Sequence, residues 1–241
     1  MNEKDLKTSP KQRFFIILIA VLMLGSMIAG YALIVINGGK SGGSTSTEQI
    51  SEAKLMEYEV AYDKKEAEFA EATKDDFAVF SQYRSEVKAF NEAAANGGGI
   101  QTRDLLDGSG RELEAGDEDY LAYYIGWCPD ETVFDSVYDD AANPTKLVRI
   151  LDPGMGLIEG WNLAVEGMKI GGVREMTISS ELAYGDSREI CGGLNKPLKF
   201  IVMAKEKDGS LKTLADELDL ASTKLQYAQY GIDYDTMMVS E

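Results

Sequence analysis

The residues best suited to chemistry lie in one run, 157–185, LIEGWNLAVEGMKIGGVREMTISSELAYG. Its Gly160–Trp161 step precedes a short amphipathic turn of helix, residues 173–178 have strand character, and Tyr184 lies in the loop that follows. The chain contains no histidine, which excludes imidazole acid–base chemistry and histidine zinc sites. These residues predict an apolar aromatic pocket in a small α+β domain.

The amino-acid pattern of this run resembles that of FKBP-type peptidyl-prolyl isomerases. The matching patterns are Leu-Ile-x-Gly-Trp at 157–161, Gly-Met-x-x-Gly at 167–171 and Ala-Tyr-Gly at 183–185. Residues 120–127 resemble the family's aromatic strand, and Phe-Asp-Ser at 134–136 follows at the expected distance. The resemblance covers about residues 100–207 and implies an antiparallel sheet wrapped on a short helix.

The resemblance also implies a set of site residues. Trp161 would form the pocket floor, Asp135 would orient the imide or a tyrosine hydroxyl, and the Ile158 N–H would bind a substrate carbonyl. The implied aromatic walls are Tyr124, Phe134, Tyr184 and Phe200. The remaining substrate-binding residues would be Leu157, Leu147 and Leu194.

The chemistry implied by the resemblance is rotation about an X–Pro bond, which needs neither an acid nor a base. The barrier arises from amide resonance, and the twisted transition state is less dipolar than either planar isomer. A pocket that strips water from the imide therefore favours rotation. The implied substrates are proline-containing peptides or unfolded exported proteins, and no cofactor or metal is expected.

Several positions depart from the family's pattern. Leu147 and Arg149 replace usual strand aromatics, Leu182 replaces a common tyrosine, and the loop 186–196 lacks the apolar-Pro-Pro run that normally rims the pocket. An isomerase is the first prediction. A non-catalytic binding or chaperone module remains the alternative, and a purely structural surface protein is a weaker one.

The net charge and the cysteine content restrict which classes of partner and which kinds of cysteine site we expect. With 41 acidic and 24 basic residues the net charge is −17, which argues against nucleic acid as a partner. Cys128 and Cys191 are the two cysteines, too few for a disulfide scaffold or a cysteine metal site. Because one follows a pocket strand and the other lies in the rim loop, we hypothesise a disulfide between them outside the cytoplasm.

The N-terminal segment predicts a membrane anchor. Residues 14–36 carry no charge, and as a helix they would span about 35 Å, enough for a bilayer core of about 30 Å. Basic residues are concentrated in 1–13, so the positive-inside rule places that end in the cytoplasm. We expect a single-pass, bacterial-like protein of the cell membrane with its C-terminal bulk outside the cytoplasm.

The other segments are predicted from composition. Residues 37–47 form a Gly/Ser linker, 48–96 an acidic helical spacer, 146–151 a strand, and 208–241 a helical segment with a frayed acidic tail. An apolar stripe runs through Phe80, Tyr83, Val87, Phe90 and Ala94. The helical region should pack as a stalk or on the next domain, with homo-oligomerisation as a second possibility.

Overall fold

The computed structural model describes residues 50–239. The predicted cytoplasmic end, membrane helix and linker therefore lie outside the described residues. No helix within 50–239 is long and apolar enough to cross a membrane. The helices are α2 Glu52–Ala72, α3 Lys74–Phe80, η1 Ser81–Glu86, α4 Glu92–Gly97, η2 Pro153–Met155, α5 Glu159–Ala164, η3 Ser180–Leu182, α6 Gly209–Gln229 and α7 Tyr234–Val239. The strands are β1 Ile100–Leu106, β2 Tyr120–Trp127, β3 Val133–Ser136, β4 Val173–Ile178 and β5 Leu198–Glu206.

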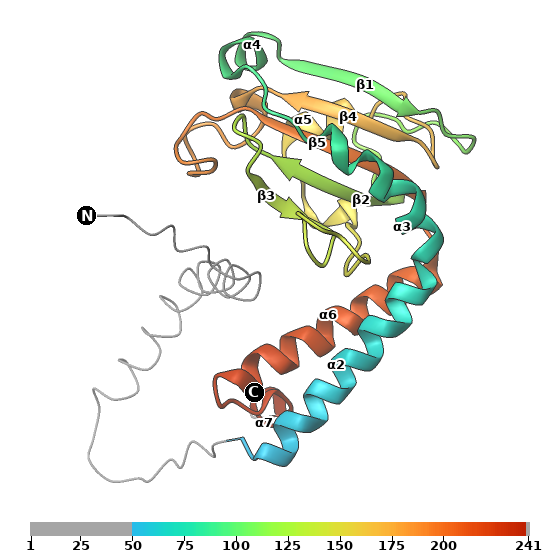
Figure 1. The fold of residues 1–241 in the computed structure, drawn as a ribbon, viewed down its shortest axis with the longest axis vertical. Coiled ribbons are helices and arrows are strands. Elements are labelled where there is room, and N and C mark those ends of the chain that lie inside the picture. The colour runs from blue at the N-terminus through green and yellow to red at the C-terminus, as the bar shows by residue number, and fades with distance from the viewer. Residues whose placement is uncertain (1–49, 240–241) are drawn as a thin grey trace. The chain divides into compact units, whose positions relative to one another are not determined.

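The strands form one antiparallel sheet in the order β1-β4-β5-β2-β3, with β5 in the middle (Figure 1). The register pairs Tyr124 of β2 with Val202 of β5, and Met176 of β4 with Phe200 of β5. Since side chains alternate between the faces of a strand, Tyr124, Met176 and Phe200 share one face. Helix α5 packs on this inner face, as expected for a sheet wrapped on a short helix.

The prediction of a strand at 146–151 was wrong. Leu147 makes a single bridge to Tyr138, and Leu151 makes a single bridge to Ala122 of β2. The segment thus divides its backbone bonds between two partners, and neither contact extends into a ladder.

The outer face of the sheet is covered by residues that precede it. All eight residues of β2 are buried, so both of its faces are covered. On the outer side, the Tyr123 hydroxyl donates to Asp76 of α3 at 2.9 Å, and the Trp127 indole N–H donates to the Lys88 carbonyl at 2.9 Å. Phe80 is fully buried against this face. Residues 73–97, which we call the cover, therefore belong to the core and do not act as a free spacer.

The cover is not the continuous helix that the apolar stripe predicted. Helix α3 ends at Phe80, a 3-10 turn follows, and Val87 is extended at φ −67° and ψ 103°. The Phe90 N–H donates to the Pro129 carbonyl at 3.0 Å. The backbone from Val87 to Phe90 thus bonds to the loop after β2 instead of continuing a helix, while Phe80 and Val87 remain buried.

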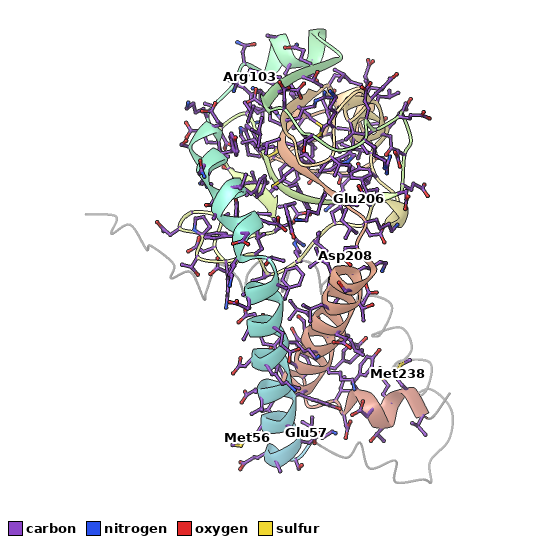
Figure 2. All side chains as sticks on the ribbon, turned by 90° about the vertical axis from the view of Figure 1, so that its right-hand side faces the viewer. Met56, Glu57, Arg103, Glu206, Asp208 and Met238 are labelled. Carbon is purple, nitrogen blue, oxygen red and sulfur yellow. A yellow bond between two sulfur atoms is a disulfide. The ribbon has the colours of Figure 1, made fainter. Side chains whose placement is uncertain are left out.

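Helix α6 packs on α2 (Figure 1). An ion pair joins Lys65 of α2 to Glu217 of α6 at 2.7 Å. Figure 2 shows Met56 of α2 and Met238 of α7 at the same end of this pair.

The expected fraying of the acidic tail is also corrected for residues 233–239. The buried Tyr58 hydroxyl donates to Asp233 at 2.8 Å and to Asp235 at 3.0 Å. Lys224 pairs with Asp235 at 2.6 Å. These bonds fasten α7 to the base of the helix pair.

Candidate functional site

Trp161 lies on α5 with only 2% of its surface exposed. Its indole N–H donates to the Tyr120 hydroxyl at 2.9 Å, which fixes the ring. The helix can press this closely on the sheet because residue 160 is glycine. A Cβ there would lie 2.3 Å from Ile178 Cγ2, closer than real Cβ contacts allow.

Three further rings stand edge-on around this floor. The ring centroids of Tyr124 and Phe200 lie 5.7 Å and 5.2 Å from that of Trp161, with near-perpendicular planes. Phe134 meets Phe200 in the same way at 5.6 Å. Edge-to-face contacts are the favoured arrangement for aromatic pairs. Gly126 makes room for two of the rings, because a Cβ there would lie within 2.9 Å of both Phe134 and Phe200.

These rings enclose a cavity of about 320 Å³. Its lining contains eight of the ten residues predicted for catalysis or substrate binding. The lining residues are Tyr124, Phe134, Asp135, Leu151, Gly156, Leu157, Ile158, Trp161, Tyr184 and Phe200.

Two predicted substrate-binding residues are absent from this lining. Leu147 is fully buried in the core, and Leu194 is 44% exposed in the loop after Tyr184. Leu151 and Gly156 were not predicted. They reach the cavity because the irregular segment before α5 lines part of it.

A polar cluster occupies one edge of the cavity. Asp135 accepts hydrogen bonds from the Tyr124 hydroxyl and from Arg149. The Arg149 Nε also donates to the Ser136 carbonyl at 2.9 Å, and its guanidinium lies 5.7 Å from the Tyr124 ring centroid. Burial raises the pKa of the Tyr124 hydroxyl, Arg149 lowers it and Asp135 raises it, with a net shift upward. The hydroxyl therefore stays protonated at neutral pH and is a hydrogen-bond donor.

The backbone N–H of Ile158, a residue that lines the cavity, has no hydrogen-bond partner among the described residues. Ile158 is the N-cap residue of α5, with φ −60° and ψ 146°. Its N–H meets no acceptor within residues 50–239. An unpaired N–H beside an apolar cavity is suited to a carbonyl oxygen of a bound peptide.

The rim loop after Tyr184 is tied down covalently. Cys128, just after β2, and Cys191 in the loop form a disulfide with a Cα–Cα distance of 5.4 Å. The Asn195 N–H also donates to the Gly185 carbonyl at 2.7 Å. The Arg188 guanidinium lies over the Tyr184 ring, 4.9 Å from its centroid.

Metal-ligating side chains do not gather in this part of the molecule. No three His, Cys, Asp or Glu residues within 50–239 come close enough to hold an ion. The cavity presents rings, aliphatic surface, the Tyr124 and Tyr184 hydroxyls, the Asp135 carboxylate and the unpaired Ile158 N–H. This arrangement can bind and desolvate a peptide group.

Comparisons with known proteins define the class. The sequence model of FKBP-type peptidyl-prolyl cis-trans isomerases matches residues 111–205. An FK506-binding protein of Neisseria meningitidis serogroup B is 39% identical over 89 residues, which cover 36% of this chain and 76% of that protein. The FK506-binding protein 4 of Neurospora crassa is 39% identical over 95 residues, 39% of this chain and 19% of that protein.

A solved isomerase of Pseudomonas syringae is 22% identical, covers 55% of this chain and 93% of that structure, and has a TM-score of 0.35. The family match and the Neisseria relative carry the assignment. The chain belongs to the FKBP-type peptidyl-prolyl cis-trans isomerases. The predicted family and enzyme class are thereby confirmed.

Proposed function

We propose that this protein is anchored at the cell membrane and isomerises X–Pro bonds in exported polypeptides, and that the aromatic cavity is its active site. The observation that carries the proposal is the cavity itself. Trp161, Tyr124, Phe134 and Phe200 enclose apolar space beside the unpaired Ile158 N–H.

The proposed mechanism is desolvation. A prolyl ring seated on Trp161 places its imide among aromatic edges, where water is displaced. The planar imide loses more favourable solvation than the less dipolar twisted state, so the barrier falls. The Ile158 N–H holds one carbonyl of the substrate, and Asp135 orients the Tyr124 hydroxyl toward the imide. Leu157, Ile158 and Phe200 favour an apolar residue before proline.

The rim favours a second candidate, a module that holds proline segments without accelerating rotation. The loop 186–196 is closed by a disulfide, and Arg188 lies over the Tyr184 ring. A rim fixed in this way would restrict access to the cavity and slow exchange of bound peptide.

Proline-isomerisation kinetics on the full chain in detergent separate the two candidates. An isomerase accelerates exchange of an Ala-Leu-Pro-Phe peptide, and Trp161→Ala or Phe134→Ala lowers kcat/KM by roughly tenfold or more, since each removes apolar surface that displaces water from the imide and a loss of about 1.4 kcal/mol is already tenfold. Phe77→Ala is the matched control, because Phe77 packs against Tyr138 away from the cavity. Binding of the peptide by wild type without acceleration would favour the holding module.

The membrane location is tested separately. Residues 14–36 are uncharged and follow a basic segment, which supports an orientation with the later residues outside the cytoplasm. Protease added to intact cells should digest the protein after residue 37. Protection in intact cells, with digestion only after lysis, would contradict the proposed orientation.

A further inference from the structure

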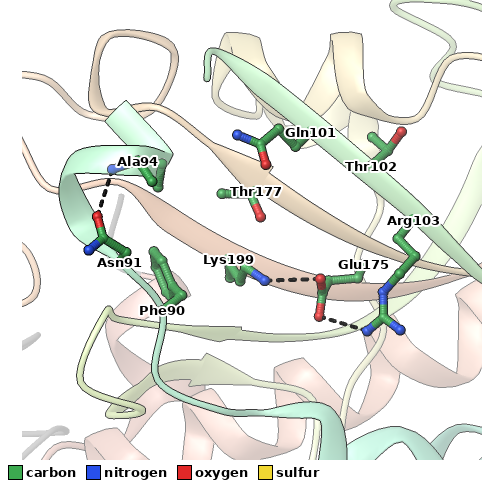
Figure 3. A pocket seen from close by; sticks show the side chains of 10 residues that line it. Phe90, Asn91, Ala94, Gln101, Thr102, Arg103, Glu175, Thr177 and Lys199 are labelled. Carbon is green, nitrogen blue, oxygen red and sulfur yellow. Dashed lines mark hydrogen bonds and ion pairs between the residues drawn. The ribbon is translucent and has the colours of Figure 1, made fainter. Parts of the chain in front are cut away.

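A second groove, of about 330 Å³, lies on the outer face of the sheet between α4 and strands β1, β4 and β5. Its lining residues are Phe90, Asn91, Ala94, Ala95, Gln101, Thr102, Arg103, Glu175, Thr177 and Lys199. Figure 3 shows Phe90 and Ala94 from the cover on one side, and Gln101 and Thr177 from the sheet on the other.

The groove and the catalytic cavity lie on opposite faces of the same sheet. Lys199 lines the groove, whereas its neighbour Phe200 lines the cavity. Successive residues of a strand point to opposite faces, so the sheet itself separates the two sites. A ligand of the groove therefore cannot touch the Trp161 floor.

The groove contains polar groups that lack partners. Thr177 is 6% exposed, yet its hydroxyl has no hydrogen-bond partner in the part of the chain that the structure describes. Gln101 beside it is exposed, and its side-chain amide also has no hydrogen-bond partner within residues 50–239. Neither group is a buried polar atom without a partner, so both are open to solvent and their hydrogen-bonding capacity is available to a ligand.

The charged groups of the groove already neutralise one another. The Glu175 carboxylate accepts from Lys199 at 2.9 Å and from Arg103 at 3.3 Å (Figure 3). Arg103 also pairs with Glu86 at 2.8 Å. The groups left for a ligand are uncharged amides and hydroxyls next to the Phe90 ring, which suits peptide groups and an apolar side chain.

The edge of β1 adds unpaired backbone beside the groove. The Ser179 N–H donates to the Gly99 carbonyl at 2.8 Å, and the register pairs Thr102 with Met176. In an antiparallel sheet, hydrogen-bonded and non-hydrogen-bonded residue pairs alternate. Gly99 and Ser179 form a hydrogen-bonded pair, so Thr102 and Met176 form a non-hydrogen-bonded pair, and the Thr102 N–H and C=O point away from β4. No strand within residues 50–239 pairs with that side of β1. An extended chain can add to such an edge.

We propose that this groove and the β1 edge form a second binding site for an extended polypeptide segment, distinct from the proline cavity. The site rests on the proposed function in one respect, since its occupant is another segment of the isomerase's unfolded client. Main-chain groups of that segment pair with Thr102, Gln101 and Thr177, and an apolar side chain packs on Phe90. Holding the client here raises its local concentration at the cavity.

The test uses the full chain in detergent and a fluorescein-labelled 20-residue peptide of Ala, Ser, Leu and Phe that lacks proline. Ala94→Arg fills the groove from the exposed face of α4, and Ala93→Arg places the same side chain on that helix outside the groove lining. We expect Ala94→Arg to weaken binding at least tenfold in fluorescence anisotropy. Ala93→Arg should bind like wild type. Thr177→Val, which removes only the hydroxyl, should weaken binding several-fold.

Isomerisation of the tetrapeptide is measured on the same samples and should be unchanged in all three variants, because so short a substrate engages only the cavity. Equal peptide affinity in Ala94→Arg and Ala93→Arg would overturn the proposal. So would a change in self-association on sedimentation caused by Ala94→Arg alone, because the groove would then be a contact between copies of the chain. An inactive cavity with intact peptide binding would refute the proposed catalysis and leave the groove standing.

Discussion

Asp135, Arg149 and Tyr124 hold one another at the edge of the cavity. Asp135 is half exposed, and the Arg149 guanidinium fixes it by bonding both its carboxylate and the next carbonyl, Ser136. Arg149 stands at a position where the family usually has an aromatic residue. Compared with an aromatic residue, Arg149 contributes no ring surface, but it holds the Asp135 carboxylate in position.

We predict that Arg149→Gln lowers kcat/KM by roughly tenfold, since a charge-assisted hydrogen bond is worth about 1.5–3 kcal/mol when it positions a group. The melting temperature should change little, because exposed ion pairs add about 0–1 kcal/mol to stability. Kinetics and thermal melts of this variant are compared with those of Arg111→Gln, which loses an ion pair with Asp117, since neither residue lines the cavity. Unchanged kinetics with a lowered melting temperature would make Arg149 a purely structural residue.

At the scale of elements, the rim loop and the cover decide how the site is supported. The Cys128–Cys191 bridge closes a stretch of 63 residues and holds the loop that follows Tyr184. In the chain-entropy description, a bridge of this length stabilises a fold by about 4 kcal/mol, at the upper end of the typical range of about 2–4 kcal/mol for disulfides.

The double variant Cys128→Ser with Cys191→Ser should lose about that much unfolding free energy in urea, and its KM for proline peptides should rise because the loop is released. Wild type is the reference, and reduction with dithiothreitol should reproduce the effect. Thiol titration of unfolded, unreduced wild type should find no free thiol. Two free thiols would contradict the bridge.

The cover makes a second element-scale prediction. A fragment beginning at Ile100 would expose the outer faces of Tyr123 and Trp127, both fully buried here. Exposing two large apolar side chains costs about 3–6 kcal/mol, against a typical total stability of about 5–15 kcal/mol. Fragment 100–207 should therefore bind ANS and lack near-UV circular dichroism, while fragment 50–241 should be native. A rigid, soluble 100–207 fragment would show that the cover is dispensable.

The sequence located the cavity floor because Trp161, Phe134 and Tyr184 stand in short local motifs. It missed Leu151 because tertiary packing, and not a repeating pattern, brings that residue to the cavity. Arg149 could have been found by asking which cation accompanies Asp135. Packing of the helical region on the next domain was left open beside a stalk, because an Ala/Glu/Lys-rich composition fits both arrangements equally well. The useful signal was the run 120–127, which is apolar on both alternating faces and so indicates a strand covered on both sides.

At the scale of the whole molecule, the titration behaviour follows from buried tyrosines and the missing histidine. Burial raises the pKa of Tyr120 to about 12, although the Trp161 hydrogen bond lowers it in part. Burial likewise raises the pKa values of Tyr123 and Tyr138. The unfolded chain releases these protons near pH 10, and the folded chain retains them to higher pH.

The unfolding free energy and kcat/KM should therefore be nearly constant from pH 6 to 9. Above about pH 10 stability should fall, because there the unfolded state binds fewer protons than the folded state. Urea denaturation at pH 7, 9 and 11 measures this slope, with Tyr230→Phe, an exposed tyrosine, as the control. A steep change in either quantity between pH 6 and 8 would show that a group important for folding or activity titrates in that range, and would contradict the prediction.

The central place of β5 has a consequence for how the chain assembles during synthesis. Strand β5 lies between β4 and β2, and α6, which completes the pair with α2, follows it directly. Until residues 198–229 have emerged, β1 with β4 and β2 with β3 are two separate ribbons, and the cover has only part of a surface to pack on. Folding cannot proceed segment by segment from the N-terminal end. The emerging chain stays open until residues 198–229 arrive, and an isomerase of this form must itself be kept from aggregating before it can act on others.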